Sequence, residues 1–372
     1  MIGSRGVPAT FGGIEHHVEE LGARLAARGH QVTVYARSNY VQKNVVTYRG
    51  MRVVSLRTVD TKHLDAIAQS FAATLAALMA VGPRPDVLHY HAIGPGVAAV
   101  LPRYASRSSV ALTVHGRVGE RAKWGAAAQL FLSGAERLSA RVPHATIVVS
   151  QDLKRHYAER YKRETFYIPN GVAPAQLRAA SEITRRWGLQ PGSYFLFVGR
   201  LVPEKAPDLL IEAFRRVPGQ MRLVLAGGSS HTDDFVNSLR LAASTDDRIV
   251  MTDYVYGQTL EELYTNAAAF VLPSSLEGLP LTLLEAVSYG LPVIASGIAP
   301  HYEILSSDGP GHRIFPTGSV PGLVEAMAQV IEGGKDERAG ASKAREMILK
   351  RYDWDEAAAS TESVYRRIAR KS

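Results

Sequence analysis

Short apolar runs alternate with longer amphipathic segments along almost the whole chain. The apolar runs have the length and composition of buried strands, and the segments between them repeat apolar residues at the spacing of helices that cover a sheet. This alternation predicts parallel sheets joined by crossover helices, which is the α/β fold class. Strands are expected at residues 31–36, 52–56, 87–90, 110–114, 146–150, 194–198, 222–226, 249–252, 268–272 and 293–295, and helices at 14–28, 64–80, 126–141, 207–216, 320–331 and 355–370.

The number of expected strands favours two doubly wound, Rossmann-like domains over one. A (β/α)8 barrel is the alternative, but glycine-rich strand exits near the start of each half argue against it. The turn-rich sequence at 168–172 marks the expected hinge. We therefore expect a first domain at 1–175, a second at 176–352 and a C-terminal helix in 353–372. Ligands bind at the carboxyl ends of strands in open sheets, so two facing sheets would form a central cleft.

Composition narrows the choice of partners and location. The chain of 372 residues is 46% hydrophobic and has a net charge of +8, which can favour nucleic acid, an anionic membrane or anionic small substrates. Its basic residues are scattered, so we expect no nucleic-acid partner. The absence of cysteine excludes disulfides and cysteine-bound zinc. With no signal peptide and no apolar run near the ~20 residues that span a bilayer, we expect a cytoplasmic protein that can lie peripherally on the membrane.

Two carboxylates, Glu277 and Glu285, flank a Gly-Leu-Pro turn between an expected strand and an expected helix. Pro280 suits the first position of that helix. The backbone N–H groups of Gly278 and Leu279 would face an anion at the helix N-terminus. The alternative is that both glutamates are ordinary solvated side chains, which is the commoner case for a lone pair at this spacing.

A second candidate site follows the strand expected at 194–198. Gly199-Arg200 ends that strand, and Lys205 stands just before the next helix. Two fixed cations stabilise a departing diphosphate more in the transition state than in the ground state. Arginine grips such a group through two donors, whereas lysine acts as a point charge. In isolation, an ordinary surface arginine and lysine would be the simpler explanation.

Two features of the first half are candidates for ligand contact. Gly12-Gly13 precedes an amphipathic helix, where glycine lets backbone N–H groups approach a phosphate. The pattern is not Gly-x-Gly-x-x-Gly, which weakens a nicotinamide-cofactor interpretation, and a plain connecting loop is the alternative. His115 ends the strand expected at 110–114 and can donate a hydrogen bond. A partly buried structural histidine is the commoner alternative.

These motifs, combined, resemble glycosyltransferase family 4, whose retaining enzymes have the GT-B fold. The resemblance rests on Glu277-x7-Glu285, on Arg200 followed by Lys205, on His115 and on the opening Gly-x-Arg-Gly-x-Pro…Gly-Gly-x-Glu. The opening, with residues 120–125, is similar to a bacterial rhamnosyltransferase-like branch of surface-polysaccharide assembly. The resemblance implies a hexosyltransferase-type enzyme that moves a sugar from a nucleoside-diphosphate sugar to a hydroxyl acceptor, which could be a lipid-linked saccharide.

The resemblance also implies roles for individual residues. Arg200 and Lys205 would stabilise the departing diphosphate, Glu277 would orient the sugar hydroxyls, and Glu285 would hold the ribose. His115 would hydrogen-bond the sugar. The donor would bind mainly to residues 176–352 and the acceptor mainly to 1–175, with the C-terminal helix packing back on the first domain. The backbone groups implied in donor binding belong to Gly12, Gly13, Gly278 and Leu279.

No cofactor beyond the nucleotide sugar is expected, and no metal. Asp353-Trp-Asp355 has the Asp-x-Asp form of a metal motif, but it stands where a helix cap is expected. The chain departs from the family at Ala206, at 117–119 and at its start, where only Met1 and Ile2 precede the first glycine. A first strand this short is expected to weaken the first sheet. The alternatives are a nucleotide-sugar epimerase, a phosphorylase and a non-catalytic sugar-nucleotide-binding module.

Overall fold

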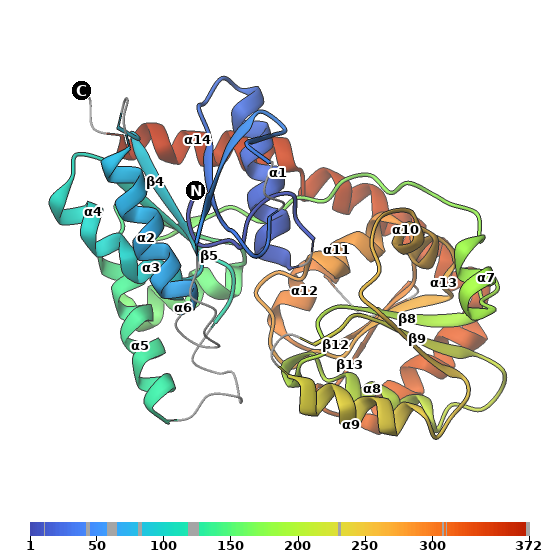
Figure 1. The fold of residues 1–372 in the computed structure, drawn as a ribbon. Helices are drawn as coiled ribbons and strands as arrows, with labels where there is room; N and C mark the ends of the chain where they lie inside the picture. Colours follow the sequence, from blue (N-terminus) through green and yellow to red (C-terminus); the bar gives the residue numbers. More distant parts are fainter. Residues whose placement is uncertain are drawn as a thin grey trace. The chain divides into compact units, whose positions relative to one another are not determined.

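The chain folds into two compact units (Figure 1). The computed structural model describes residues 1–10, 12–41, 45–57, 65–80, 84–117, 126–229, 232–306, 309 and 311–369. The first unit comprises Met1–Asn170 with Trp354–Ser372, and the second comprises Gly171–Asp353. The chain therefore leaves the first unit close to the turn-rich sequence at 168–172 and returns to it for its last helix.

The second unit is built on a six-stranded parallel sheet in the order β10-β9-β8-β11-β12-β13. The chain starts at β8, adds strands on one side, then crosses back to add β11 on the other. The point between β8 and β11 is thus the topological switch point, where open α/β sheets bind ligands. The strands are β8 (Tyr194–Val198), β9 (Arg222–Ala226), β10 (Ile249–Asp253), β11 (Ala269–Leu272), β12 (Val293–Ser296) and β13 (His312–Phe315).

Crossover helices connect these strands, as the parallel pairing requires. The Val320–Arg351 helix contains a kink at Gly334, where φ is 41° and ψ is −99°. The helices are α7 (Glu182–Trp187), α8 (Pro207–Phe214), α9 (Asp233–Ala243), α10 (Gly257–Asn266), α11 (Leu281–Ser288), α12 (Ala299–Leu305) and α13 (Val320–Arg351), with a 3₁₀ turn η2 (Pro203–Lys205).

The first unit contains two smaller sheets. A four-stranded parallel sheet has the order β4-β5-β6-β7, and a three-stranded sheet has the order β1-β3-β2, in which β2 is antiparallel to β3. The strands are β1 (Thr33–Arg37), β2 (Thr47–Tyr48), β3 (Met51–Leu56), β4 (Val87–His91), β5 (Ser109–Val114), β6 (Ala145–Val148) and β7 (Phe166–Tyr167).

The short start of the chain connects these two sheets. Ile2 pairs in parallel with Tyr90 of β4, through bonds from Ile2 N to His89 O (2.9 Å) and from His91 N to Ile2 O (2.8 Å). On the other side, Tyr35 N of β1 donates to Met1 O at 3.1 Å. Ile2 is fully buried. Met1 and Ile2 thus bond to a strand of each sheet.

Helices cover these sheets, and the C-terminal helix belongs to the first unit. It packs against α1, and Arg28 Nε donates to Glu362 Oε2 at 2.7 Å. Asp355, in its first turn, pairs with Arg24 at 2.9 Å. The helices are α1 (Gly13–Ala27), α2 (Asp65–Met79), α3 (Ile93–Gly96), α4 (Val100–Ala105), α5 (Ala126–Arg141), α6 (Gln151–Tyr161) and α14 (Trp354–Ile368), with a 3₁₀ turn η1 (Val97–Ala99).

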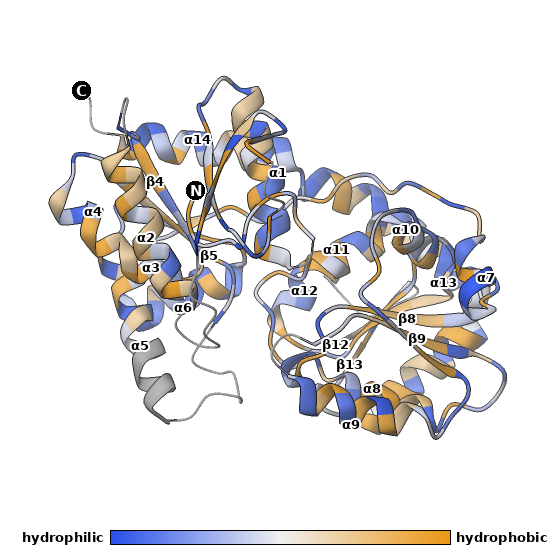
Figure 2. Cartoon of the chain, in the orientation of Figure 1, coloured by the Kyte–Doolittle hydropathy of each residue, from blue (hydrophilic) through white to orange (hydrophobic). Residues whose placement is uncertain are grey.

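Apolar residues gather on the strands, and polar residues on outer surfaces such as α7 (Figure 2). Strands β5, β6, β11 and β12 are buried along their whole length, which explains why their apolar runs were readable from the sequence. The α/β fold class is confirmed. None of the helices within the described ranges is long and apolar enough to cross a membrane.

The predicted elements differ from the structure at two instructive places. Strand β13 was not predicted, because it lies at the edge of its sheet and its central residues, Arg313 and Ile314, are only half-buried. The helix predicted at 320–331 continues to Arg351, because Gly334 kinks the chain without ending the helix. Pro280 precedes α11 as its N-cap and is not the first helical residue.

Strand β13 is held to α13 by a buried carboxylate, Glu337, which is 1% exposed. It accepts hydrogen bonds from Arg313 Nε at 2.9 Å and from Gly311 N at 2.5 Å.

Glu337→Gln should lower the free energy of unfolding by about 3 kcal/mol, because it leaves Arg313 without its counter-charge. Glu332→Gln, at an exposed site of the same helix, should change it by less than about 0.5 kcal/mol. Urea unfolding measures both, and equal midpoints would contradict the assignment.

Candidate active site

Strand order brings the two strongest sequence motifs of the second unit to one sheet edge. Strands β8 and β11 are neighbours, with Phe195 opposite Ala269. Arg200 and Lys205 follow β8, and Glu277 follows β11. Because both strands are parallel, their carboxyl ends meet at the same edge, at the switch point.

Close backbone packing shapes the exit of β8. A Cβ on Gly227 would lie 1.7 Å from the carbonyl oxygen of Gly199, so only glycine fits where β9 ends beside β8. A Cβ on Gly199 would lie 3.1 Å from Cδ of Lys205, so the absence of a side chain there leaves room for the lysine stem. These two glycines let Lys205 turn back toward the end of the sheet.

Lys205 and Glu277 form an ion pair with each other. Lys205 Nζ lies 2.7 Å from Glu277 Oε1, and the two side chains are only 12% and 13% exposed. Ser274 Oγ donates to the same carboxylate oxygen at 2.7 Å. The two loops are also tied by the backbone, because Ser275 N donates to Glu204 O at 2.9 Å. The lysine predicted to bind the diphosphate and the glutamate predicted to bind the sugar are therefore in direct contact.

Two opposing effects set the pKa of Glu277. Burial pushes this pKa up, but the charge and hydrogen bond of Lys205, with smaller contributions from His301 and Ser274, leave it below its ordinary value. His301 is itself buried, and burial lowers its pKa to about 4. Glu277 is therefore an ionised carboxylate that depends on Lys205 to remain so.

Arg200 offers an uncommitted positive charge at the exit of β8, the strand that Lys205 also follows. It is half-buried, and its guanidinium has no hydrogen-bond or ion-pair partner within the described ranges. An arginine in this state can bind an anion through two parallel donors without first breaking another contact. The exit of β8 thus presents one free cation and one neutralised cation.

Glu285 lies on α11 and is oriented by a tyrosine. Tyr264 Oη donates to Glu285 Oε2 at 3.0 Å, and the Tyr264 ring stacks on Tyr289 with centroids 5.1 Å apart. Burial, followed by the charge of Glu285, raises the pKa of Tyr264 well above its usual value, so the hydroxyl stays a donor. The buried Gly278 and Leu279 precede this helix on the same loop as Glu277.

In the first unit, His115 is joined by two histidines that the sequence did not single out. It follows β5, while His91 ends the neighbouring strand β4 and His17 lies on α1. His91 Nδ1 lies 3.4 Å from His115 Nε2, and the His17 and His115 ring centroids are 4.6 Å apart. Burial lowers the pKa of all three, that of His17 to about 4. Only the strand order could have revealed the grouping, because the three lie far apart in sequence.

The glycine loop before α1 has the geometry of a helix start. Gly12 is the N-cap with φ 105°, and it makes no side-chain cap, as glycine cannot. Two amides of the preceding loop are already used, because Arg5 N donates to Glu15 at 3.0 Å and Ala9 N donates to Glu19 at 2.6 Å. Gly13 is exposed at the first turn. The Glu15 carboxylate lies against this helix start, since a Cβ on Gly12 would meet its Oε2 at 2.1 Å.

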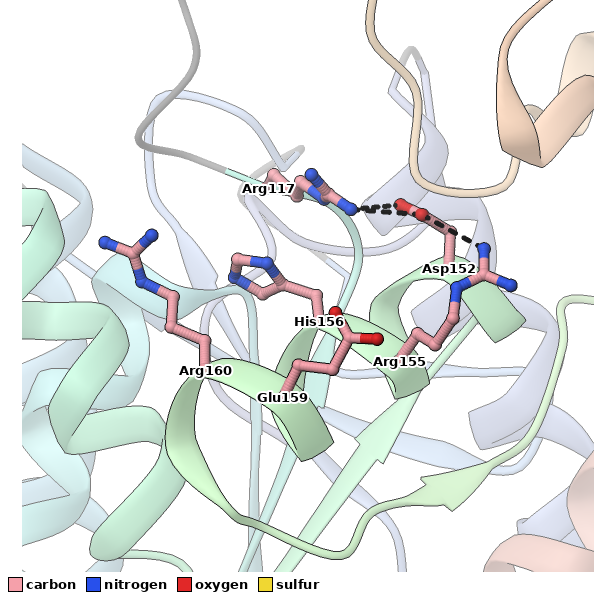
Figure 3. A pocket seen from close by; sticks show the side chains of 6 residues that line it. All are labelled: Arg117, Asp152, Arg155, His156, Glu159 and Arg160. Atoms are coloured by element: carbon pink, nitrogen blue, oxygen red, sulfur yellow. Dashed lines mark hydrogen bonds and ion pairs between the residues drawn. The ribbon is translucent and has the colours of Figure 1, made fainter.

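A polar pocket of about 370 Å³ also lies in the first unit (Figure 3). Arg117, two residues after His115, donates to both carboxylate oxygens of Asp152 at 3.0 and 2.8 Å. Arg155 approaches the same carboxylate at 3.5 Å. The remaining lining residues are His156, Glu159 and Arg160, all on α6. Residues 120–125 of the family resemblance lie outside the described residues.

Comparisons with known proteins match both halves of the chain. The model for Glycosyltransferase Family 4 matches residues 11–176, and that for Glycosyl transferases group 1 matches residues 182–347. A D-inositol 3-phosphate glycosyltransferase of Xylanimonas cellulosilytica is 28% identical over 97% of this chain and 93% of that protein. A sucrose-phosphate synthase from Thermosynechococcus elongatus has a similar structure, with a TM-score of 0.81, 21% identity and coverage of 96% and 93%. Anabaena Alr3699/HepE, solved with UDP-glucose, has a TM-score of 0.79, 17% identity and 96% coverage of each chain.

The two Rossmann-like units, the switch-point site and these likenesses define the class: the chain is a glycosyltransferase of the GT-B fold that uses nucleotide sugars. Within that class it belongs with the family 4-like enzymes. The predicted GT-B fold and the likeness to glycosyltransferase family 4 are thereby confirmed, whereas the rhamnosyltransferase-like branch and the retaining mechanism stay predictions.

The ion pair generates a pH-dependent prediction. In Lys205→Gln, burial would raise the pKa of Glu277 against only the smaller contributions of His301 and Ser274, so the variant should be less stable than the wild type by about 3 kcal/mol at pH 7. In the wild type, the stability from ionised Glu277 is present above its unfolded pKa and is lost as pH falls through its depressed folded pKa. In Lys205→Gln the folded pKa of Glu277 is raised, so its penalty is relieved as pH falls through that raised pKa, and the difference between the proteins should shrink as pH falls from 7 to 4.

Urea unfolding at several pH values measures this difference. Lys205→Gln combined with Glu277→Gln is the matched control, because it has no carboxylate to titrate at this position. Its stability relative to Glu277→Gln should not vary over the same range. A Lys205→Gln penalty that stays constant from pH 7 to pH 4 would contradict the assigned coupling.

Proposed function

We propose that the protein is a retaining hexosyltransferase that moves a sugar from a nucleoside-diphosphate sugar to a hydroxyl acceptor. The observation that supports this most is the group formed by Arg200, Lys205 and Glu277 at the switch point of the second unit. An anion would attract Lys205 away from Glu277, which would leave a buried carboxylate without its counter-charge. A ligand that brings both an anion and hydroxyl donors satisfies both residues, and a sugar diphosphate is such a ligand.

The proposed reaction exchanges one bond at the anomeric carbon for another. The bond to the diphosphate oxygen breaks, and the acceptor hydroxyl oxygen forms the new bond from the same face. The electron pair of the broken bond goes to the diphosphate, whose charge Arg200 and Lys205 stabilise. The acceptor proton passes to the departing phosphate oxygen, so no general base is assigned. The transition state has oxocarbenium character, and the hydroxyls of the sugar remain bound to Glu277.

The other predicted residues take supporting roles in this proposal. Glu285, oriented by Tyr264, binds the ribose hydroxyls of the nucleotide. The amides of Gly278 and Leu279 face the donor at the start of α11, and those of Gly12 and Gly13 do so at the start of α1. His115 donates a hydrogen bond to the donor sugar. Because two cations are available for the diphosphate, the transfer step is proposed to need no metal there.

The acceptor is proposed to bind in the first unit. The polar pocket lined by Arg117, Asp152 and Arg155 supports a hydroxyl-rich acceptor, because it offers both donors and acceptors of hydrogen bonds (Figure 3). The likeness of the chain's opening to rhamnosyltransferase-like enzymes supports a role in surface-polysaccharide or glycoconjugate synthesis, in which the acceptor can be a lipid-linked saccharide.

Peripheral contact with the cytoplasmic face of the membrane is proposed on two observations. The chain has a net charge of +8, which favours anionic lipid. On α2, Phe71, Leu75 and Met79 are spaced four residues apart and are 37%, 47% and 78% exposed. That spacing places them on one face of the helix, where they can enter the headgroup region.

Nucleotide binding tests the proposed donor site. A nucleoside diphosphate at 100 times its Kd should stabilise the wild type by about 2.7 kcal/mol in thermal unfolding. Arg200→Ala should weaken both nucleoside diphosphate and inorganic diphosphate at least tenfold, because both carry the anion. Glu285→Ala should weaken only the nucleoside diphosphate, because only that ligand has a ribose. Arg216→Ala, an exposed arginine paired with Glu212, is the control and should leave both affinities unchanged.

The same preparation separates a transferase from the alternatives. Nucleoside diphosphate should be released from the nucleotide sugar at a high rate only when a hydroxyl acceptor is added, and Glu277→Gln should lower that rate while nucleotide affinity is retained. Acceptor-independent turnover would favour an epimerase or a phosphorylase. A folded protein that binds no nucleoside diphosphate would refute the proposal.

Vesicle sedimentation tests the membrane contact. Replacing Phe71, Leu75 and Met79 by glutamine should reduce binding to vesicles containing anionic lipid at least tenfold, because it removes the apolar face that enters the interface. Leu241→Gln, which changes a leucine that is 73% exposed in the second unit, is the control and should bind as the wild type does. Binding that is independent of lipid charge and of these three residues would contradict the proposal.

A further inference from the structure

Three histidines in the first unit converge from separate elements. His17 comes from α1, His91 from the end of β4 and His115 from the end of β5. One ring nitrogen from each lies within 4.8 Å of those of the other two. His17 and His91 are 3% and 0% exposed, whereas His115 is half-buried. The group is therefore enclosed on most sides but can be reached past His115.

Two nitrogens of this group are buried without a hydrogen-bond partner among the described residues. These are Nε2 of His17 and Nε2 of His91. A buried polar atom without a partner is destabilising, so two in one group call for a ligand. The nearby His89 is different, because its nitrogens contact Tyr365 at 2.5 Å and Thr113 at 2.7 Å.

An amide outside the group orients His17. Nδ1 of His17 lies 2.8 Å from Oδ1 of Asn170. Because Oδ1 can only accept a hydrogen bond, His17 must carry its proton on Nδ1. The lone pair of the buried Nε2 is then unused. Histidines that bind metals typically donate their second ring N–H to an oxygen in this way.

The spacing fits a tetrahedral metal. Zinc binds histidine nitrogen at 2.0–2.1 Å, so two ligands of a tetrahedral site lie about 3.3 Å apart. Nδ1 of His91 and Nε2 of His115 are already 3.4 Å apart, and the unpartnered Nε2 of His91 is the other nitrogen of the same ring. The widest separation in the group, 4.8 Å at most, would have to shrink by about 1.5 Å, which side-chain rotation can supply.

We propose that His17, His91 and His115 form a three-histidine site for a transition-metal dication of the zinc type. Imidazole is a preferred ligand of zinc, copper and nickel, whereas magnesium and calcium prefer oxygen. The three imidazoles leave a fourth position for water or a substrate oxygen, on the open side at His115. The ligands are neutral histidines, the form that burial already favours here.

This site shares only His115 with the proposed donor contacts, and metal binding there does not depend on the transferase activity. Its ligands and its orienting residue, Asn170, all belong to the first unit. A metal bound there would hold the His115 ring in one orientation. The test reads metal binding directly, so its failure would leave the proposed transfer reaction standing.

The experiment titrates the untagged, metal-free full-length protein with Zn²⁺ against a chromophoric chelator, and with Co²⁺ followed by visible absorption. We expect one metal per chain. His17→Gln and His91→Gln should each weaken Zn²⁺ binding at least tenfold. Asn170→Ala should weaken it about tenfold without removing any ligand, as loss of an orienting contact does. His16→Gln, next to His17 on the same helix, should change the affinity less than about twofold.

Folding of each variant is checked by the thermal shift with nucleoside diphosphate, which reports on the second unit, and by circular dichroism. Should His91→Gln not fold, His17→Gln and Asn170→Ala still decide the question. Zn²⁺ binding weaker than about millimolar in the wild type would overturn the proposal. Equal affinity in the wild type, His17→Gln and Asn170→Ala would overturn it as well, because the metal would then bind elsewhere.

Discussion

The mutual dependence of Lys205 and Glu277 is the constraint on which the candidate donor site rests. Each side chain is mostly buried, and a buried charge is tolerated only with a partner. The pair therefore fixes how the loop after β8 meets the loop after β11. The backbone hydrogen bond from Ser275 N to Glu204 O joins the same two loops. Strand order makes the pairing possible, since 72 residues separate the two in sequence.

The pair also explains why a ligand of mixed chemistry suits this edge of the sheet. A phosphate alone would compete for Lys205 and leave Glu277 without its counter-charge. A sugar alone would leave Arg200 without an anion. In the proposed donor complex both arrive in one molecule, so that hydroxyl donors would replace the lysine on the carboxylate while the lysine would turn to the anion. The electrostatic exchange keeps every buried charge compensated, so binding of the complete ligand is favoured over binding of either part.

The fold, and the position of the second-unit candidate residues at strand exits, were predictable from the sequence because both rest on local signals. Buried strands such as β8 and β11 read as unbroken apolar runs, and their exits carry Arg200, Lys205 and Glu277. The edge strand β13 was missed because its residues are half polar. The contacts of Glu277 with Lys205 and His301, and of Glu285 with Tyr264, were not predictable, because they depend on which strands are neighbours and on how helices pack.

The first unit shows the converse situation, in which burial gathers polar groups without pairing them. Ile2 connects β4 to the rest of the unit, and the strand that it pairs with ends in His91. His115 and His17 then arrive from β5 and α1, and none of the three brings a carboxylate to the group. In the second unit an opposite charge offsets the cost of burial, whereas here the histidines stay neutral. Neutral nitrogens with unused lone pairs are bases toward a cation, and for that reason the group is better suited to holding a metal than an anion.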